Sequence, residues 1–248
     1  MPTSPEPPVP VTMPAMFMGW YDLASLHWRY PPEALRPLLP EGLEPDLFDG
    51  SAWVGLIPFS MEHIRFPGLP VIPFVSRFPE TNVRTYVRGP DGGDGIWFFS
   101  LDVDRLLPAL VARTTYRLPY CWGPMAIERR GATVAYWGRR RWPAPRGAGS
   151  RVVVEVGDRI PAGEVDALTH FLTARWALYS TFRGGLVRAP VEHPRWPLRE
   201  ARLVALEQDL VEAAGLPSPN GPPLVTWSPG VTVRVGVPRR VGRRPTRR

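Results

Sequence analysis

Proline and glycine interrupt this chain at short intervals. Its 248 residues include 33 prolines and 23 glycines, which is well above ordinary usage. Proline breaks the hydrogen-bond ladder inside a helix, and glycine marks turns. The sequence therefore favours a loop-rich, mainly β architecture over a helical bundle. Because 44% of the residues are apolar, the chain can still fill one substantial core.

The two ends of the chain differ in composition from its body. The net charge of +7 arises at the C-terminus, where residues 234–248 hold seven arginines and no acid. Residues 1–233 hold 23 arginines against 23 acids and are formally neutral. Neither the proline-rich start nor the arginine-rich end can bury much apolar surface. We expect a disordered leader over residues 1–15, one domain over residues 16–237 and a disordered tail over residues 238–248.

Cysteine usage and hydropathy bear on the compartment. Cys121 is the only cysteine, so the chain forms no internal disulfide, as is typical of a reducing compartment. No apolar stretch is long enough to span a membrane, and the N-terminus lacks the charged and apolar regions of a secretory signal. We expect a soluble cytoplasmic protein without membrane contact.

Apolar and aromatic runs bounded by turn residues predict most of the secondary structure. Two amphipathic helices are expected over residues 164–180 and 198–214, the second closed by Gly215. Shorter helices are expected over residues 31–39 and 106–113. Strands are expected over residues 16–30, 52–64, 78–87, 95–103, 132–142, 151–156 and 224–237. This order predicts an α+β fold with a mainly antiparallel sheet.

The strand expected over residues 78–87 has two different faces. Threonine and valine alternate on one face, and the other face carries the polar side chains Glu80, Asn82, Arg84 and Tyr86. A polar outer surface and an inward polar lining both explain this row. Glu80 and Arg84 lie four residues apart, roughly 13 Å by strand rise, so they do not pair directly.

Seven segments, in order, resemble the YqjF-like family of uncharacterised bacterial proteins. They are HWRYPPEALRPLLPEGL, FDGSAWVGLIPF, FPETNVRTYV, GIWFFSLD, ARTTYRLPY, FLTARWALYS and VEHPRWPL, within about residues 19–200. That family is grouped with acetoacetate decarboxylase. The resemblance implies a mostly antiparallel β barrel or cone around a small-molecule cavity, with a few peripheral helices. It also suggests a homo-oligomer.

The resemblance extends to single residues of the catalytic region. Acetoacetate decarboxylase carries Ala/Gly-Arg-Glu followed by Pro-Lys-Lys, whose first lysine forms a Schiff base. The similar stretches here are Ala112–Thr114 and Pro119–Cys121, so Tyr120 occupies the position of the nucleophilic lysine. The resemblance also implies that Glu80 corresponds to an interior glutamate, and that Arg84 and Arg113 are available for a substrate carboxylate.

The chain contains no lysine, since all 30 Lys+Arg positions are arginine. A Schiff base requires a primary amine, which tyrosine does not supply. Imine-based decarboxylation by a lysine of this chain is therefore excluded. Tyr120 is instead able to donate a hydrogen bond or act as an acid.

Three arginines are candidates for binding an anion, because a guanidinium stays charged when buried and makes paired bonds to a carboxylate. These are Arg84, Arg113 and Arg175, the last within the apolar stripe of the helix expected over residues 164–180. Each arginine has a structural ion pair as its alternative. Asn82, Tyr86 and His27 complete the expected substrate contacts.

The four histidines lack the spacing of a metal site. His27 and His193 are candidates for a general base or for hydrogen-bonded packing beside aromatic residues. No histidine pair has helical or strand spacing, and none lies beside a cysteine, so we expect no metal. Phosphate-binding loops and nucleophile elbows are absent as well, so no cofactor is expected.

The function expected from these observations is a barrel cavity for a carboxylate- or carbonyl-bearing ligand. If the protein is an enzyme, we expect acid/base chemistry of the lyase, isomerase or cyclase type, with Glu80, Tyr120 and His193 as catalytic residues. The alternative is a non-catalytic ligand sensor or scaffold. In that case the arginine-rich tail contacts nucleic acid or another acidic partner.

Overall fold

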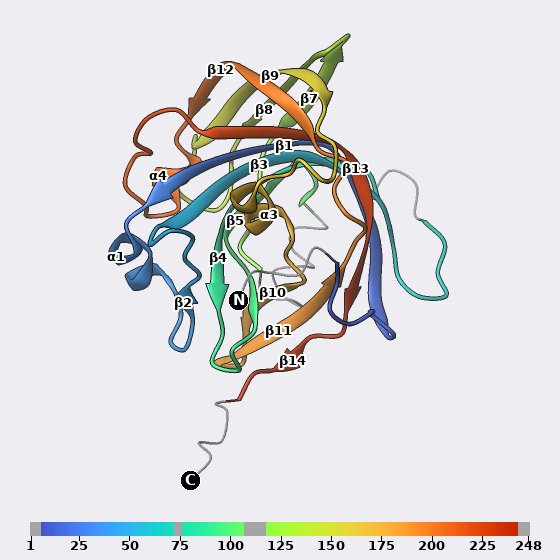
Figure 1. Cartoon of the computed structure of the whole chain (residues 1–248), viewed down its shortest axis with the longest axis vertical. Helices are drawn as coiled ribbons and strands as arrows, with labels where there is room; N and C mark the ends of the chain where they lie inside the picture. The colour runs from blue at the N-terminus through green and yellow to red at the C-terminus, as the bar shows by residue number, and fades with distance from the viewer. Residues whose placement is uncertain (1–5, 72–75, 107–117, 243–248) are drawn as a thin grey trace.

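The chain forms a mostly antiparallel sheet with few helices, as its sequence predicts (Figure 1). The computed structural model describes residues 6–71, 76–106 and 118–242. The helices are short: α1 Pro32–Leu35, η1 Arg36–Leu38, α3 Ala167–Thr173 and α4 Leu210–Ala213. The strands are β1 Pro14–Tyr30, β2 Glu44–Pro45, β3 Ala52–Arg65, β4 Phe78–Arg88, β5 Asp94–Val103, β6 Tyr120–Trp122, β7 Met125–Arg130, β8 Thr133–Arg139, β9 Gly149–Arg159, β10 Ala177–Phe182, β11 Gly185–Glu192, β12 Arg199–Gln208, β13 Leu224–Gly236 and β14 Arg239–Arg240.

Seven strands of the described chain close on themselves to form a ring. In sheet order they are β1, β3, β4, β5, β10, β11 and β13, and β11 closes the ring by pairing with the C-terminal part of β13. All of these pairings are antiparallel except the one between β10 and β5. The sheet then leaves the ring, because the N-terminal part of β13 pairs with β12. The result is a ring with a branch rather than a clean barrel.

The branch of β12, β9, β8 and β7 folds over the outside of the ring (Figure 1). Between the two layers lies an apolar core that includes Leu56 and Val83 from the ring and Tyr136, Val152 and Val154 from the branch. Strands β3 and β4 are buried on both faces in consequence. One face contacts this core, and the other faces the interior of the ring.

The helix expected over residues 164–180 is much shorter than predicted. Asp166 caps α3 by accepting a hydrogen bond from the Thr169 amide, but the helix ends at Thr173 and β10 follows. The Arg175 side chain donates to the Phe171 carbonyl over 2.8 Å and so satisfies one of the carbonyls that the helix end leaves open. Pairing of β10 with β5 and β11 outweighs the helical pattern beyond this point.

The helix expected over residues 198–214 is wrong for most of its length. Residues Arg199–Gln208 form β12, which pairs with β9 and β13, and only the short helix α4 follows. The pairing with β9 shifts register between Leu203 and Ala205. This irregularity lets Leu203 and Leu206, three residues apart, contact the same core, which mimics helical spacing.

Strands extend into both of the segments for which disorder is expected. Strand β1 begins at Pro14 and pairs there with Gly236. At the other end, Arg239 and Arg240 form β14 and pair with Arg188 and Val187 of β11. The helix expected over residues 106–113 lies outside the described residues, apart from Leu106.

Candidate functional site

A cavity of about 310 Å³ lies inside the ring. Alternate residues of the ring strands point into it, as the two-residue period of a strand requires. Most of its wall is apolar and comes from β1, β3, β5, β10, β11 and β13. The described lining residues are Met16, Met18, Trp20, Leu23, Ile57, Phe59, Met61, Ile64, Phe66, Phe78, Glu80, Asn82, Arg84, Phe98, Leu101, Leu118, Tyr120, Leu178, Ser180, Val187, Ala189, Val235 and Pro238.

The polar part of the wall is concentrated on β4. Glu80, Asn82 and Arg84 face the cavity in succession, and Tyr120 of β6 lies beside them. The polar row of residues 80–84 is therefore an inward lining and not an outer surface. Tyr86, the fourth member of the row, does not line the cavity. It belongs to an apolar cluster with Phe171 and Leu172 of α3.

Glu80 is a buried carboxyl group that favours its neutral form. Only 2% of the residue is exposed. Burial raises the pKa of Glu80 to about 8, and the negative charge of Asp102 adds to the increase. Hydrogen bonds from the Asn82 and Tyr120 side chains act in the opposite direction. At neutral pH Glu80 is therefore mainly a carboxylic acid, which can give a proton, with a minor carboxylate form that can take one.

Tyr120 is the immediate partner of Glu80. Burial raises the pKa of the Tyr120 hydroxyl well above its ordinary value, and the charge and hydrogen bond of Glu80 raise it further. The hydroxyl therefore keeps its proton and donates a hydrogen bond to Glu80. The two side chains form one acid pair on the wall of the cavity.

Arg84 is a buried cation without a carboxylate partner among the described residues. The residue is 7% exposed, and its Nε has no hydrogen-bond partner there. Its Nη2 donates a long bond of 3.4 Å to the Tyr86 hydroxyl, and its Cζ lies 5.7 Å from the centre of that ring. A positive charge in this setting favours an anion in the cavity.

Tyr86 and His27 hold Arg84 in place through hydrogen bonds on the side away from the cavity. The Tyr86 hydroxyl donates to the Leu172 carbonyl over 2.9 Å, so the His27 Nε2 at 2.6 Å must donate to that hydroxyl. Burial and the charge of Arg84 lower the pKa of His27. His27 is therefore a neutral positioning group and does not line the cavity.

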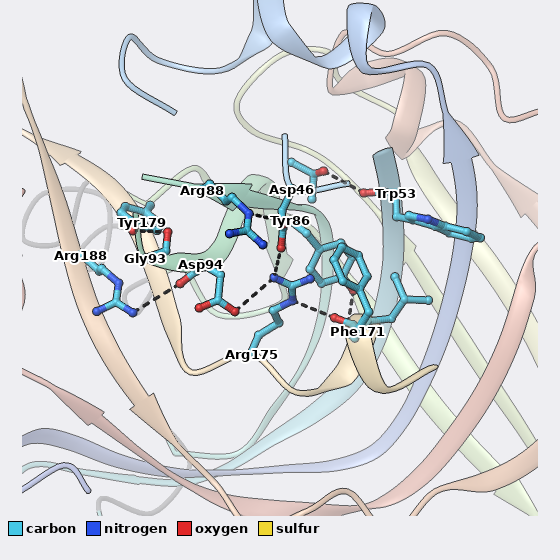
Figure 2. Close-up of polar contacts among 12 residues, drawn as sticks. Asp46, Trp53, Tyr86, Arg88, Gly93, Asp94, Phe171, Arg175, Tyr179 and Arg188 are labelled. Atoms are coloured by element: carbon cyan, nitrogen blue, oxygen red, sulfur yellow. Dashed lines mark hydrogen bonds and ion pairs between the residues drawn. The ribbon is translucent and has the colours of Figure 1, made fainter. Parts of the chain in front are cut away.

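Arg175 is engaged in an ion pair away from the cavity (Figure 2). Its Nη1 lies 2.6 Å from Asp46 Oδ2 and 3.4 Å from Asp94 Oδ2. Its guanidinium also sits 4.0 Å from the centre of the Phe171 ring. The buried anion that Arg175 meets is therefore Asp46, and Arg175 does not line the cavity.

His193 lies among aromatic rings and does not line the cavity inside the ring. Its ring is centred 4.5 Å from that of Trp176 and 5.3 Å from that of Trp196. Its Nδ1 lies 2.8 Å from the Pro194 carbonyl oxygen, and burial lowers its pKa. The structure does not bring His193 to Glu80. Arg113 lies outside the described residues.

Two further properties of the described residues bear on the kind of site. They contain no group of three or more histidine, cysteine, aspartate or glutamate side chains placed to hold a metal ion. None of their helices is long and apolar enough to cross a membrane. The polar groups that line the cavity inside the ring, called the ring cavity below, are carboxyl, amide, guanidinium and hydroxyl groups.

Comparison with known sequences points to a single family. Residues 17–232 match the family profile DUF2071, described as an uncharacterized conserved protein. The chain is 35% identical over 213 residues to the uncharacterized protein YqjF of Bacillus subtilis (strain 168), covering 86% of this chain and 87% of YqjF.

Solved structures with the same fold are acetoacetate decarboxylase-like. An acetoacetate decarboxylase-like enzyme from Sphingomonas wittichii RW1 is 17% identical with a TM-score of 0.63, covering 94% of this chain and 96% of its own. The acetoacetate decarboxylase of Legionella pneumophila is 11% identical with a TM-score of 0.64, covering 95% of this chain and 92% of its own. The enduracididine biosynthesis enzyme MppR, solved with pyruvate, is 15% identical with a TM-score of 0.63, covering 95% of this chain and 93% of its own. At these identities the likeness shows the fold.

Proposed function

Since the chain belongs to the DUF2071 family of uncharacterized conserved proteins, whose fold here is that of acetoacetate decarboxylase, we propose that it binds a small carboxylate- or carbonyl-bearing molecule in the ring cavity. One observation carries this proposal. Glu80 Oε2, Asn82 Oδ1 and Arg84 Nε are buried without hydrogen-bond partners among the described residues. Each such group costs about 1–3 kcal/mol, and all three lie on one cavity wall. A bound polar ligand gives them partners.

The chemistry proposed for the bound molecule is acid/base catalysis. The chain has no lysine amine for a Schiff base, whereas Glu80 has a pKa of about 8. A group with such a pKa exchanges protons readily near neutral pH. In its minor carboxylate form, Glu80 would remove a proton next to a carbonyl, and the acid so formed would return that proton at another atom. The Tyr120 hydroxyl would then donate its one hydrogen bond to that carbonyl in place of Glu80. Isomerisation, dehydration and cyclisation all fit this step.

Arg84 is proposed to hold the anionic group of the same molecule. Glu80 and Arg84 are roughly 13 Å apart along the strand. A ligand that meets both must carry its anion and its reacting carbonyl at separate positions. His193 is left out of this proposal because it lies outside the cavity wall.

The structural neighbours support the proposed ligand class by analogy. MppR has the same fold and was solved with pyruvate, a keto acid. Fold alone does not transfer an activity, so the buried polar groups of this chain remain the main support. The sensor or scaffold hypothesis uses the same cavity without a chemical step.

A thermal-shift screen against keto acids, hydroxy acids and aromatic carboxylates tests ligand binding. A ligand at about 100 times its dissociation constant stabilises the fold by about 2.7 kcal/mol, which raises the melting temperature by about 5–10 °C for a chain of this size. The shift is expected to vanish in Arg84→Met. It should persist in Arg130→Met, whose side chain is 86% exposed. Absence of any Arg84-dependent hit would overturn the proposal.

A further inference from the structure

The wall of the ring cavity is far more apolar than a small keto acid requires. Apart from the polar residues of β4, Tyr120 and Ser180, the described wall consists of aliphatic, methionine, aromatic and proline side chains. Three of them are methionines, which adapt their shape to apolar ligands. The aromatic and methionine residues are Met16, Met18, Trp20, Phe59, Met61, Phe66, Phe78 and Phe98.

Along β4, Arg84 and the exposed apolar residues of the cavity lie at opposite ends. Arg84 is 7% exposed and contacts Tyr86, which packs against Phe171 of α3. The opposite end of β4 begins at Phe78. There the cavity is lined by Phe66, which is 41% exposed, and by half-buried Met16. The guanidinium therefore lies deep, and the apolar wall extends toward the solvent-exposed end.

The charge of the cavity wall suits a ligand with a single negative charge. Arg84 contributes a cation, and among the described residues no carboxylate pairs with it. Glu80, the one acidic residue of the described wall, is neutral at pH 7 because its pKa is about 8. A ligand with a second carboxylate would place that charge among apolar side chains or beside Glu80, where desolvation opposes it.

From this arrangement we propose that the cavity selects a monocarboxylate with an apolar chain or ring, whose carboxylate binds Arg84 and whose carbonyl faces Glu80. Its apolar part packs against the wall formed by β1 and β3 and extends toward Phe66. The inference rests on the proposed function and narrows its ligand class. It separates this chain's ligand from small hydrophilic acids such as pyruvate.

The test is calorimetric titration of the whole chain with straight-chain monocarboxylates from acetate to decanoate. Burial of one methylene is worth about 0.8 kcal/mol, so each added methylene should tighten the dissociation constant about threefold to fourfold until the cavity is full. Octanoate should bind at least about tenfold more tightly than suberate, its dicarboxylate counterpart, and than octanamide, which lacks the charge. A flat dependence on chain length, or equal binding of suberate, overturns the inference.

Two variants separate binding in this cavity from non-specific adsorption of apolar acids. Arg84→Met should abolish octanoate binding, and Arg130→Met should leave it unchanged. Ala189→Leu places a larger side chain on the wall at a 2% exposed position and so narrows the cavity. It should weaken the binding of octanoate much more than the binding of acetate. If Ala189→Leu does not fold, Val187→Leu on the same wall replaces it. Octanoate binding that survives Arg84→Met overturns the inference.

The same titrations distinguish failure of this inference from failure of the proposed function. Arg84-dependent binding of pyruvate without binding of octanoate overturns the apolar ligand class and leaves the proposed function standing. Absence of Arg84-dependent binding for every acid overturns both.

Discussion

The guanidinium of Arg175 donates to the Asp46 carboxylate over 2.6 Å, although the two residues are 129 positions apart in the chain. Their side chains are 1% and 2% exposed. Asp46 also bonds to the β4 backbone, since its amide donates to the Tyr86 carbonyl over 2.9 Å. The pair therefore fixes the segment after α3 against the strand that carries Glu80 and Arg84.

Asp46→Asn should strongly destabilise the fold, because it leaves the Arg175 charge buried with a weaker partner. We expect the free energy of unfolding, measured with urea, to fall by about 3 kcal/mol or more. Glu44→Gln is the matched control, since Glu44 pairs with Arg36 at the surface with 68% exposure. Its effect should stay within about 0.5 kcal/mol. Equal losses in the two variants would contradict this role of Asp46.

Arg84→Met should behave in the opposite way. Because Arg84 has no carboxylate partner among the described residues, its burial is unfavourable in the ligand-free protein. We expect the free energy of unfolding to rise or to fall by less than about 1 kcal/mol, while ligand binding is lost. Urea unfolding of Arg84→Met and of Arg175→Met measures both changes in the free energy of unfolding, so that they can be compared. A loss as large as that of Arg175→Met would show that Arg84 is a structural residue.

Glu80→Gln should change how stability depends on pH. Between the ordinary pKa of 4.5 and the raised value of about 8, the folded protein keeps a proton that the unfolded chain releases. Raising the pH therefore favours unfolding of the parent, by at most about 1.4 kcal/mol per pH unit. The variant lacks this dependence. Its stability relative to the parent should increase from about pH 5 to about pH 8.

Urea unfolding of both proteins across that range measures the difference. Asp158→Asn on the exposed end of β9 serves as the control, and its curve should run parallel to that of the parent. Parallel curves for Glu80→Gln as well would show that Glu80 ionises normally.

Tyr120→Phe should raise the pKa of Glu80 further. The Tyr120 hydroxyl donates a hydrogen bond that favours the carboxylate form of Glu80, and the variant removes it. The titration of the Glu80 side-chain carbon, followed by NMR, should move to higher pH. A midpoint that moves to lower pH would mean that Tyr120 instead favours the neutral acid.

Removal of residues 241–248 tests the sensor or scaffold hypothesis. The truncation keeps β14, which pairs with β11 through Arg239 and Arg240. We expect ligand-induced thermal shifts to remain as in the full chain, since the described residues of this segment, Val241 and Gly242, do not line the cavity. Any binding of nucleic acid should weaken and become less salt-dependent. Lost ligand binding would instead assign the segment a part in the cavity.

Five of the seven ring strands, β1, β3, β4, β5 and β13, were predicted from the sequence. Strand β4 shows the reason most clearly, because its side chains alternate with a two-residue period. Thr81, Val83 and Thr85 face one way and Glu80, Asn82 and Arg84 the other, and this pattern is visible without a structure. Which face points inward was not predictable. That depends on the second layer, whose Val152 and Val154 cover the valine side of β4.

The two long helices were mispredicted because local pattern gave way to strand pairing. Leu203 and Leu206 are three residues apart, as on one face of a helix. Both contact the same core because the strand is irregular between them. Leu178 and Tyr179 likewise continue the apolar stripe of α3, yet they pair with Ile96 and Trp97 of β5. A propensity argument cannot include partners so distant in the chain.

Candidate residues of the site were easier to choose than to assign. A polar residue type does not reveal its partner, so Arg84 and Arg175 are indistinguishable in the sequence although only Arg175 has a buried aspartate. His27 and His193 are buried beside aromatic rings, away from the cavity wall. The individual apolar residues of the wall were not predicted, because they have the pattern of an ordinary core.

The hairpin of β10 and β11 is joined to the rest of the ring by two short strand pairings. Its pairing with β5 consists of Leu178 with Ile96 and Tyr179 with Trp97. Its pairing with β13 consists of Val191 with Val235 and Glu192 with Arg234. By contrast, β1 pairs with β13 along almost its whole length. Local opening follows the fewest bonds, so we expect this hairpin to swing outward first and to set how fast a molecule enters or leaves the interior.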